Sequence, residues 1–65
     1  MINQVIRWKN NMVMVFDERG EQISEFQGNY RDVRVKILAH APRGAKFFHG
    51  QWSLKTQVPV SRKDW

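Results

Sequence analysis

The sequence predicts an α+β fold in which a three-stranded antiparallel meander, one helix and a further C-terminal strand follow one another in the order β-β-β-α-β. Three observations predict it. Two short runs rich in β-branched and aromatic residues, 2–8 and 12–16, are separated by turn-forming asparagines. Apolar residues recur at helical spacing over 30–41. An apolar stretch at 45–49 follows a proline and a glycine that end the helical pattern.

The first two runs predict a hairpin. Asn10 and Asn11 lie between them, and asparagine tolerates the positive φ of tight hairpin turns. Residues 12–16 are apolar at every position, which is typical of a strand covered on both faces. We therefore expect 12–16 to be the central strand, with the helix covering one of its faces.

A second turn and a polar return strand complete the predicted meander. Asp17 and Gly20 bound the strongest turn signal in the chain, because aspartate accepts hydrogen bonds from its own downstream backbone and glycine adopts left-handed conformations. Residues 21–27 then carry few apolar groups. This composition suits an edge strand, where charge discourages pairing with another chain.

The helix is predicted over 30–41. Asn29 is a suitable N-cap, because its side-chain oxygen can accept a hydrogen bond from a free amide of the first turn. Pro42 and Gly44 end the helix. The apolar positions form one stripe, which consists of Tyr30, Val33, Ile37, Leu38 and Ala41.

The C-terminal part is predicted to contain one strand and a tail. The strand covers 45–49, with Gly50 as a bend or bulge and 51–54 as its continuation. We expect one small domain, 1–54, and a basic tail, 55–65, that packs back on it. The tail with Trp65, or a second subunit, would cover the sheet face opposite the helix.

Composition excludes several classes of protein. Hydrophobic residues make up 42% of the chain and charged residues 26%, which is the balance of a folded domain. No apolar run approaches the roughly 18 residues of a membrane span, and the N-terminus does not resemble a signal peptide. The absence of cysteine excludes disulfides and thiol chemistry, so we expect a cytoplasmic protein without membrane contact.

Enzymatic and metal chemistry are not predicted. The serines and threonines lie in no nucleophile motif, and the four glycines are isolated rather than gathered in a phosphate-binding loop. His40 and His49 lack the spacing and the third ligand of a metal site. We therefore expect a non-enzymatic protein without cofactor, and no stretch carries the motif set of a known family.

Charge is unevenly distributed along the chain. Residues 1–27 carry three cations and four acids, whereas residues 28–65 carry eight cations and two acids. This asymmetry indicates either a basic face for the phosphates of nucleic acid or a solvated surface that keeps a small domain soluble. Trp52 is the candidate side chain on which a base would stack. The candidate phosphate-binding cations are Arg31, Arg34, Lys36, Arg43, Lys46 and Lys55.

Arg34 falls inside the apolar stripe of the predicted helix. Its aliphatic stem can pack there while the guanidinium reaches water at the edge of the stripe. Alternatively, it is an ordered fork for an anion or the partner of a buried carboxylate. Both interpretations stay open at the level of sequence.

A protein partner is the alternative to nucleic acid. Val35 lies on the exposed side of the helix, and the tail carries Val58, Val60 and the terminal Trp65, which suit strand addition and an aromatic anchor. The sequence thus predicts a small binding module. Nucleic acid is the first ligand, and the alternative is an interaction or inhibitor module of the type that phages and mobile elements encode, acting as a homodimer or on a protein partner.

Overall fold

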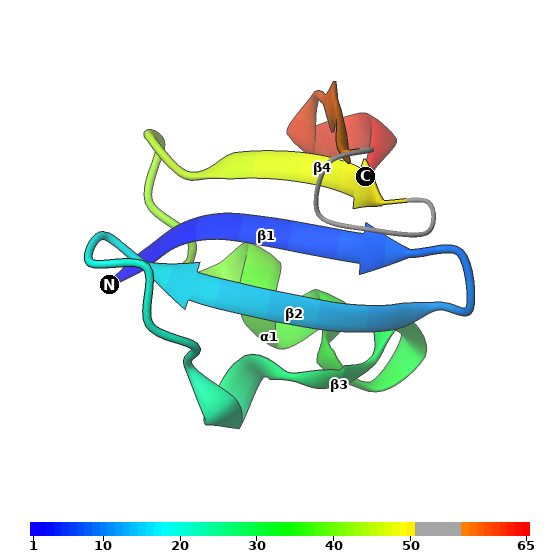
Figure 1. Ribbon diagram of the computed structural model, residues 1–65, viewed down its shortest axis with the longest axis horizontal. Coiled ribbons are helices and arrows are strands. Elements are labelled where there is room, and N and C mark those ends of the chain that lie inside the picture. The colour runs from blue at the N-terminus through cyan, green and yellow to red at the C-terminus, as the bar shows by residue number, and fades with distance from the viewer. Residues whose placement is uncertain (51–56) are drawn as a thin grey trace.

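The computed structural model describes residues 1–50 and 57–65, which form a five-stranded mixed sheet with α1 packed on one face (Figure 1). The predicted continuation at 51–54 and the candidate residues Trp52 and Lys55 lie outside the described residues. The elements are β1 (Ile2–Trp8), β2 (Met12–Asp17), η1 (Ser24–Phe26), β3 (Gly28–Asn29), α1 (Tyr30–His40), β4 (Lys46–Gly50), β5 (Gln57–Val60) and η3 (Arg62–Asp64), where η marks a 3-10 helix. No helix in these ranges is long and apolar enough to cross a membrane.

The strand order is β3-β2-β1-β4-β5, so β1 occupies the centre of the sheet. The α+β class is confirmed, but the prediction that residues 12–16 form the central strand is wrong. β1 pairs antiparallel with β2 and parallel with β4. A parallel pair needs a long crossover connection, and the segment that contains α1 supplies it. The sheet is therefore mixed rather than purely antiparallel. β3 and β2 lie on one side of β1, and β4 and β5 lie on its other side.

The predicted third strand at 21–27 is also wrong. That segment makes a single isolated bridge to β2, between Gln22 and Phe16, and then turns into η1. Its two apolar residues, Ile23 and Phe26, are three apart, which suits one helical turn better than the alternation of a strand. Phe26 is buried and Ile23 packs against the core. The strand that pairs with β2 is the shorter β3.

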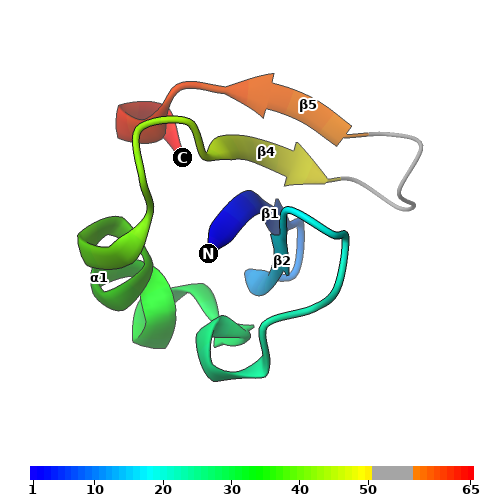
Figure 2. The ribbon, with the colours of Figure 1, turned by 90° about the vertical axis from the view of Figure 1, so that its left-hand side faces the viewer.

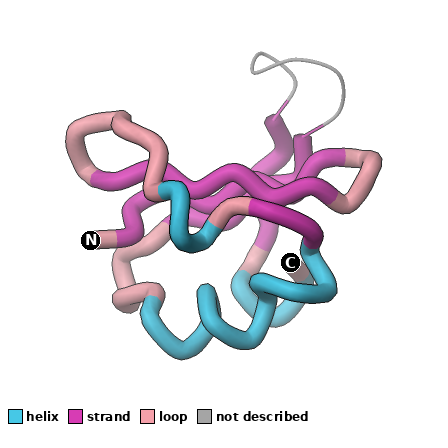
Figure 3. Tube along the Cα trace, turned by 90° about the horizontal axis from the view of Figure 1, so that it is seen from below, coloured by secondary structure: helices cyan, strands magenta, loops and turns pink. Residues whose placement is uncertain are grey.

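The predicted helix and its N-cap are confirmed. The Asn29 side chain accepts a hydrogen bond from the Arg31 amide at 3.0 Å, and α1 runs to His40. Val33 and Ile37 are buried against the sheet, with Ile37 fully inaccessible. Figure 3 shows α1 on one side of the strands. The core between them consists of Ile2, Val5, Val13, Val15, Phe26, Val33, Ile37, Phe47 and Trp65.

Trp65 lies on the same side of the sheet as α1 (Figure 2). Its ring is 5.1 Å from the ring of Tyr30 and 5.1 Å from that of Phe47, in edge-to-face arrangements, and only 3% of the residue is exposed. The expectation that Trp65 covers the opposite face is therefore wrong. A large aromatic side chain is stabilised here because it fills the space between the helix and β4.

The opposite sheet face is apolar, and among the described residues no helix covers it (Figure 3). Strand register places Ile6, Met14 and Phe48 side by side on this face. Gly50 is not the predicted bend but the last residue of β4, opposite Trp8. A Cβ at Gly50 would lie 2.6 Å from Cε3 of Trp8, so the indole ring occupies the space that a side chain would need.

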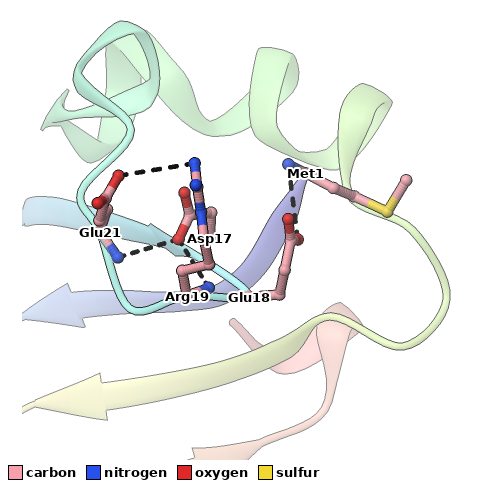
Figure 4. A network of polar contacts seen from close by, with 5 residues as sticks. All are labelled: Met1, Asp17, Glu18, Arg19 and Glu21. Carbon is pink, nitrogen blue, oxygen red and sulfur yellow. Dashed lines mark hydrogen bonds and ion pairs between the residues drawn. The ribbon is translucent and has the colours of Figure 1, made fainter.

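The turn after β2 is held by a carboxylate, as its sequence predicts. Oδ1 of Asp17 accepts hydrogen bonds from the amides of Arg19 and Glu21, both at 2.9 Å (Figure 4). The hydrogen bond from the Glu21 amide is the largest cause of the lowered pKa of Asp17, whose usual value is 3.8. Desolvation opposes it, and the Arg19 amide, the Arg19 charge and the N-terminal charge lower the pKa further. Gly20 has a φ of +85°, in the left-handed region that favours glycine.

Candidate anion-binding groove

An open groove of about 750 Å³ lies between the β1–β2 turn and the first turns of α1. Three guanidinium groups and one carboxylate line it, so its charge is positive. The N-terminus of α1 lies at this groove and adds to its positive charge, because the free amides of a helix N-terminus carry a partial positive charge. The lining residues are Arg7, Asn11, Asn29, Tyr30, Arg31, Asp32, Arg34 and Val35.

Arg7 is the most constrained cation of the groove. It extends from β1 on the same sheet face as the buried Val5, and its guanidinium carbon stands 3.6 Å from the centroid of the Tyr30 ring. Nε and Nη2 donate to Oδ1 of Asn11 at 3.1 and 2.9 Å, and Nη1 donates to the main-chain oxygen of Trp65 at 3.0 Å. Stacking and three hydrogen bonds hold the planar fork in one orientation.

The β1–β2 turn is attached directly to the start of α1. Asn11 has a φ of 65°, in the left-handed region that asparagine tolerates. Its carbonyl oxygen accepts a hydrogen bond from the Tyr30 amide at 2.7 Å. The two walls of the groove are therefore joined by a main-chain hydrogen bond, which fixes their separation.

Arg34 and Arg31 form the helical wall and are both exposed. Nε of Arg34 donates to the hydroxyl of Tyr30 at 2.9 Å, so Tyr30 orients Arg34 and also packs beneath Arg7. The interpretation of Arg34 as the partner of a buried carboxylate is wrong. Among the described residues no carboxylate is within 4.0 Å of these guanidinium groups, and Arg34 reaches the solvent-facing side of its stripe.

The remaining predicted cations lie on other surfaces. Nζ of Lys36 donates to the Glu25 carbonyl at 2.6 Å and lies 5.5 Å from the ring of Phe26, beside η1. Arg43 and Lys46 line a second cavity, which lies at the start of β4. The described cations of the predicted set are thus distributed over three surfaces, and among them only Arg31 and Arg34 share the groove.

The four candidate partner residues are also dispersed. Val35 is 73% exposed and lines the groove, and Val58 is 50% exposed on β5. Val60 packs against the core. Trp65 is buried, so in this structure its side chain offers no surface to a partner.

Sequence reasoning missed Arg7, Asn11 and Tyr30 as site residues. Arg7 lies in a segment whose composition predicts only a strand, and Tyr30 belongs to the apolar stripe of the helix. The alternation of side chains along a strand places Arg7 on the face of Val5, which is the one available signal. Alternation therefore predicts that Arg7 faces the core side of the sheet, but it does not predict contact with Tyr30 or Asn11.

The described residues contain no group of three or more metal-ligating side chains. Nδ1 of His40 is 2.9 Å from the carbonyl oxygen of Lys36, one turn earlier in α1, and its ring packs on Phe26 at 5.5 Å. The contacts of His40 are therefore made within the last turn of α1 and with η1.

Comparisons of this chain with protein-family models, with curated proteins and with solved structures found no match. Function is therefore inferred from the chemistry of the groove.

Proposed function

We propose that this protein is a small, non-enzymatic binding module that holds the phosphate groups of nucleic acid in the groove formed by Arg7, Arg31 and Arg34. The observation that carries the proposal is the convergence of three guanidinium groups on one open surface, where Arg31 and Arg34 form no salt bridge within the described residues. Guanidinium forks match phosphate oxygens in geometry and charge, and Arg7 is already ordered by its contacts with Asn11 and Tyr30.

The groove supports phosphate contacts rather than base reading. One face of the Tyr30 ring is occupied by Arg7, and Trp65 packs against its edge. The Tyr30 ring is therefore already used within the fold, by Arg7 and by Trp65. Contacts of this kind position a strand without reading its sequence, so we expect binding that depends little on base composition.

Salt dependence tests the proposal. Labelled random single strands and duplexes are titrated with the protein at about 50 and 200 mM salt. Three phosphate contacts predict an affinity that falls by about 20- to 40-fold over this range, because each contact releases condensed counterions. An absence of binding at 50 mM would overturn the proposal, since non-specific attraction to phosphate is strongest there.

Two matched variants assign the effect to the groove. Arg31→Ala removes an exposed cation of the helical wall and should flatten the slope of log affinity against log salt by about 0.7 to 0.9. Arg19→Ala removes another exposed cation, in the turn after β2 at the opposite end of that strand (Figure 1). Equal effects of the two variants would show that net charge, rather than the groove, drives binding.

Protein interaction is the second candidate, and the apolar sheet face opposite α1 favours it. Met12 is 43% exposed at its margin, and Met14, Phe16 and Phe48 are half-buried on it. A homodimer or a protein partner would use such a face, and burial of apolar surface does not weaken as salt rises. Sedimentation of the protein at several concentrations and at both salt levels tests it: a salt-insensitive dimer favours this candidate, and a monomer throughout opposes self-association.

A further inference from the structure

A second cavity, of about 540 Å³, lies where β4 begins and β5 ends, away from the arginine groove. It combines a cationic rim with an apolar floor. The rim consists of Arg43, Lys46 and Arg62, and the rest of the lining consists of Ala45, Phe47, Phe48, Pro59, Val60 and Ser61.

The rim has an excess of positive charge. Its lining includes three cations and no carboxylate. The nearby Asp64 carboxylate accepts a hydrogen bond from the Ser61 hydroxyl at 2.7 Å. Arg62 is partly used within the fold, because it donates to the carbonyl oxygens of Ala41 and Pro42. Arg43 and Lys46 are exposed cations, and within the described residues neither is ion-paired, so an anion would complement them.

The floor offers apolar side chains beside these cations. Phe48 and Pro59 are direct partners across β4 and β5, and Lys46 lies two residues before Phe48 on the same sheet face. Phe48 is half-buried and Pro59 exposed, so part of this surface faces solvent. Aromatic side chains stack with planar rings, and nearby cations bind the attached phosphate.

We propose that this cavity binds a nucleotide, with its phosphate on Arg43 and Lys46 and its base against Phe48 and Pro59. The same chemistry is presented by a free nucleotide and by one unit of a single strand. The cavity volume lies within the range of small-molecule sites, about 300 to 1,000 Å³. This site shares no lining residue with the arginine groove, so it does not depend on nucleic-acid binding there.

Titration of the 15N-labelled protein with adenosine monophosphate, and separately with ribose 5-phosphate, tests the site by NMR. The two probes share the phosphate and sugar, so they differ only in the base. We expect adenosine monophosphate to shift the amide signals of Lys46, Phe48 and Val60 and to bind more tightly than ribose 5-phosphate. Equal affinities, or shifts confined to Arg31 and Arg34, would overturn the proposal.

Variants separate stacking from charge. Phe48→Leu keeps an apolar side chain but removes the ring, and should weaken adenosine monophosphate about tenfold without changing ribose 5-phosphate. Phe16→Leu, on the same sheet face in β2, is the matched control and should change neither. Lys46→Ala alters an exposed side chain, so it tests the site even if Phe48→Leu fails to fold, and it should weaken both probes. Retention of full affinity in Lys46→Ala would contradict the assignment.

A short single-stranded oligouridine, tested on the wild type and on the Arg31→Ala/Arg34→Ala variant, distinguishes the two sources of the nucleotide. Shifts of the cavity signals by the oligomer identify a unit of a strand, and their absence while adenosine monophosphate binds identifies a free nucleotide. Either result supports the site. Adenosine monophosphate should still bind the double variant, so failure of the arginine groove and failure of this cavity give different results.

Discussion

The guanidinium of Arg7 lies over the ring of Tyr30, with its carbon 3.6 Å from the ring centroid. This contact joins the central strand of the sheet to the first residue of α1. The same Tyr30 receives a hydrogen bond from Nε of Arg34, so one aromatic residue positions two of the three cations of the groove. A residue of the helix stripe thus organises a charged surface.

Arg7→Lys should separate geometry from charge. Lysine keeps the positive charge but cannot form the double hydrogen bond to Asn11 or stack as a planar fork. We expect a loss of about 1–2 kcal/mol in the free energy of unfolding, measured in urea, from the part-buried contacts. Affinity for nucleic acid should fall while its salt slope stays nearly constant. A flattened slope with unchanged stability would contradict this role of Arg7.

Arg62→Ala should release the C-terminal segment from the end of α1. The guanidinium donates to the carbonyl oxygens of Ala41 and Pro42 at 3.1 and 2.5 Å and lies 5.1 Å from the centroid of Phe47. Loss of these part-buried charged hydrogen bonds should lower the free energy of unfolding by about 2 kcal/mol. Lys63→Ala, an exposed neighbour in η3, should change it by less than about 0.5 kcal/mol. Thermal unfolding of both variants measures the difference.

Gly50→Ala should destabilise the sheet. Its new Cβ would lie 2.6 and 2.7 Å from Cε3 and Cζ3 of Trp8 and 3.0 Å from Cγ2 of Ile6, so the indole must move. Overpacking of this kind costs about 1–3 kcal/mol. Gly44→Ala is the control, because its Cβ would meet nothing within 4 Å, and we expect a change within about 0.5 kcal/mol. Equal unfolding free energies for the two variants would exclude the clash.

The turn at Asp17 should make stability depend on pH in the acidic range. Because the hydrogen bond from the Glu21 amide lowers the pKa of the folded carboxyl, the stabilisation is present above the unfolded pKa and is lost as pH falls through the folded value. We expect the free energy of unfolding to decrease below about pH 4. Asp17→Asn keeps the accepting oxygen but not the ionisation, so its decrease should be smaller. Identical pH profiles of variant and wild type would show that Asp17 does not contribute.

Local patterns predicted the parts of the fold that depend on local contacts. The helix and the Asn29 cap follow from spacings of three and four residues and from one side-chain hydrogen bond. The turn at Asp17 and Gly20 follows from short-range chemistry of the same kind. Residues 21–27 were mispredicted because their polar composition suits an edge strand, whereas their two apolar groups, three apart, suit a single helical turn.

The sequence by itself determined the hairpin, the capped helix and the concentration of positive charge after residue 27, because each depends on neighbours along the chain. Only the tertiary structure decided that β4 lies parallel to β1, that Trp65 fills the helix side of the sheet, and that Arg7 meets Tyr30. It also separated Arg31 and Arg34 from Arg43 and Lys46. Contacts between distant segments depend on strand pairing and on the filling of one shared core, and no local spacing encodes either.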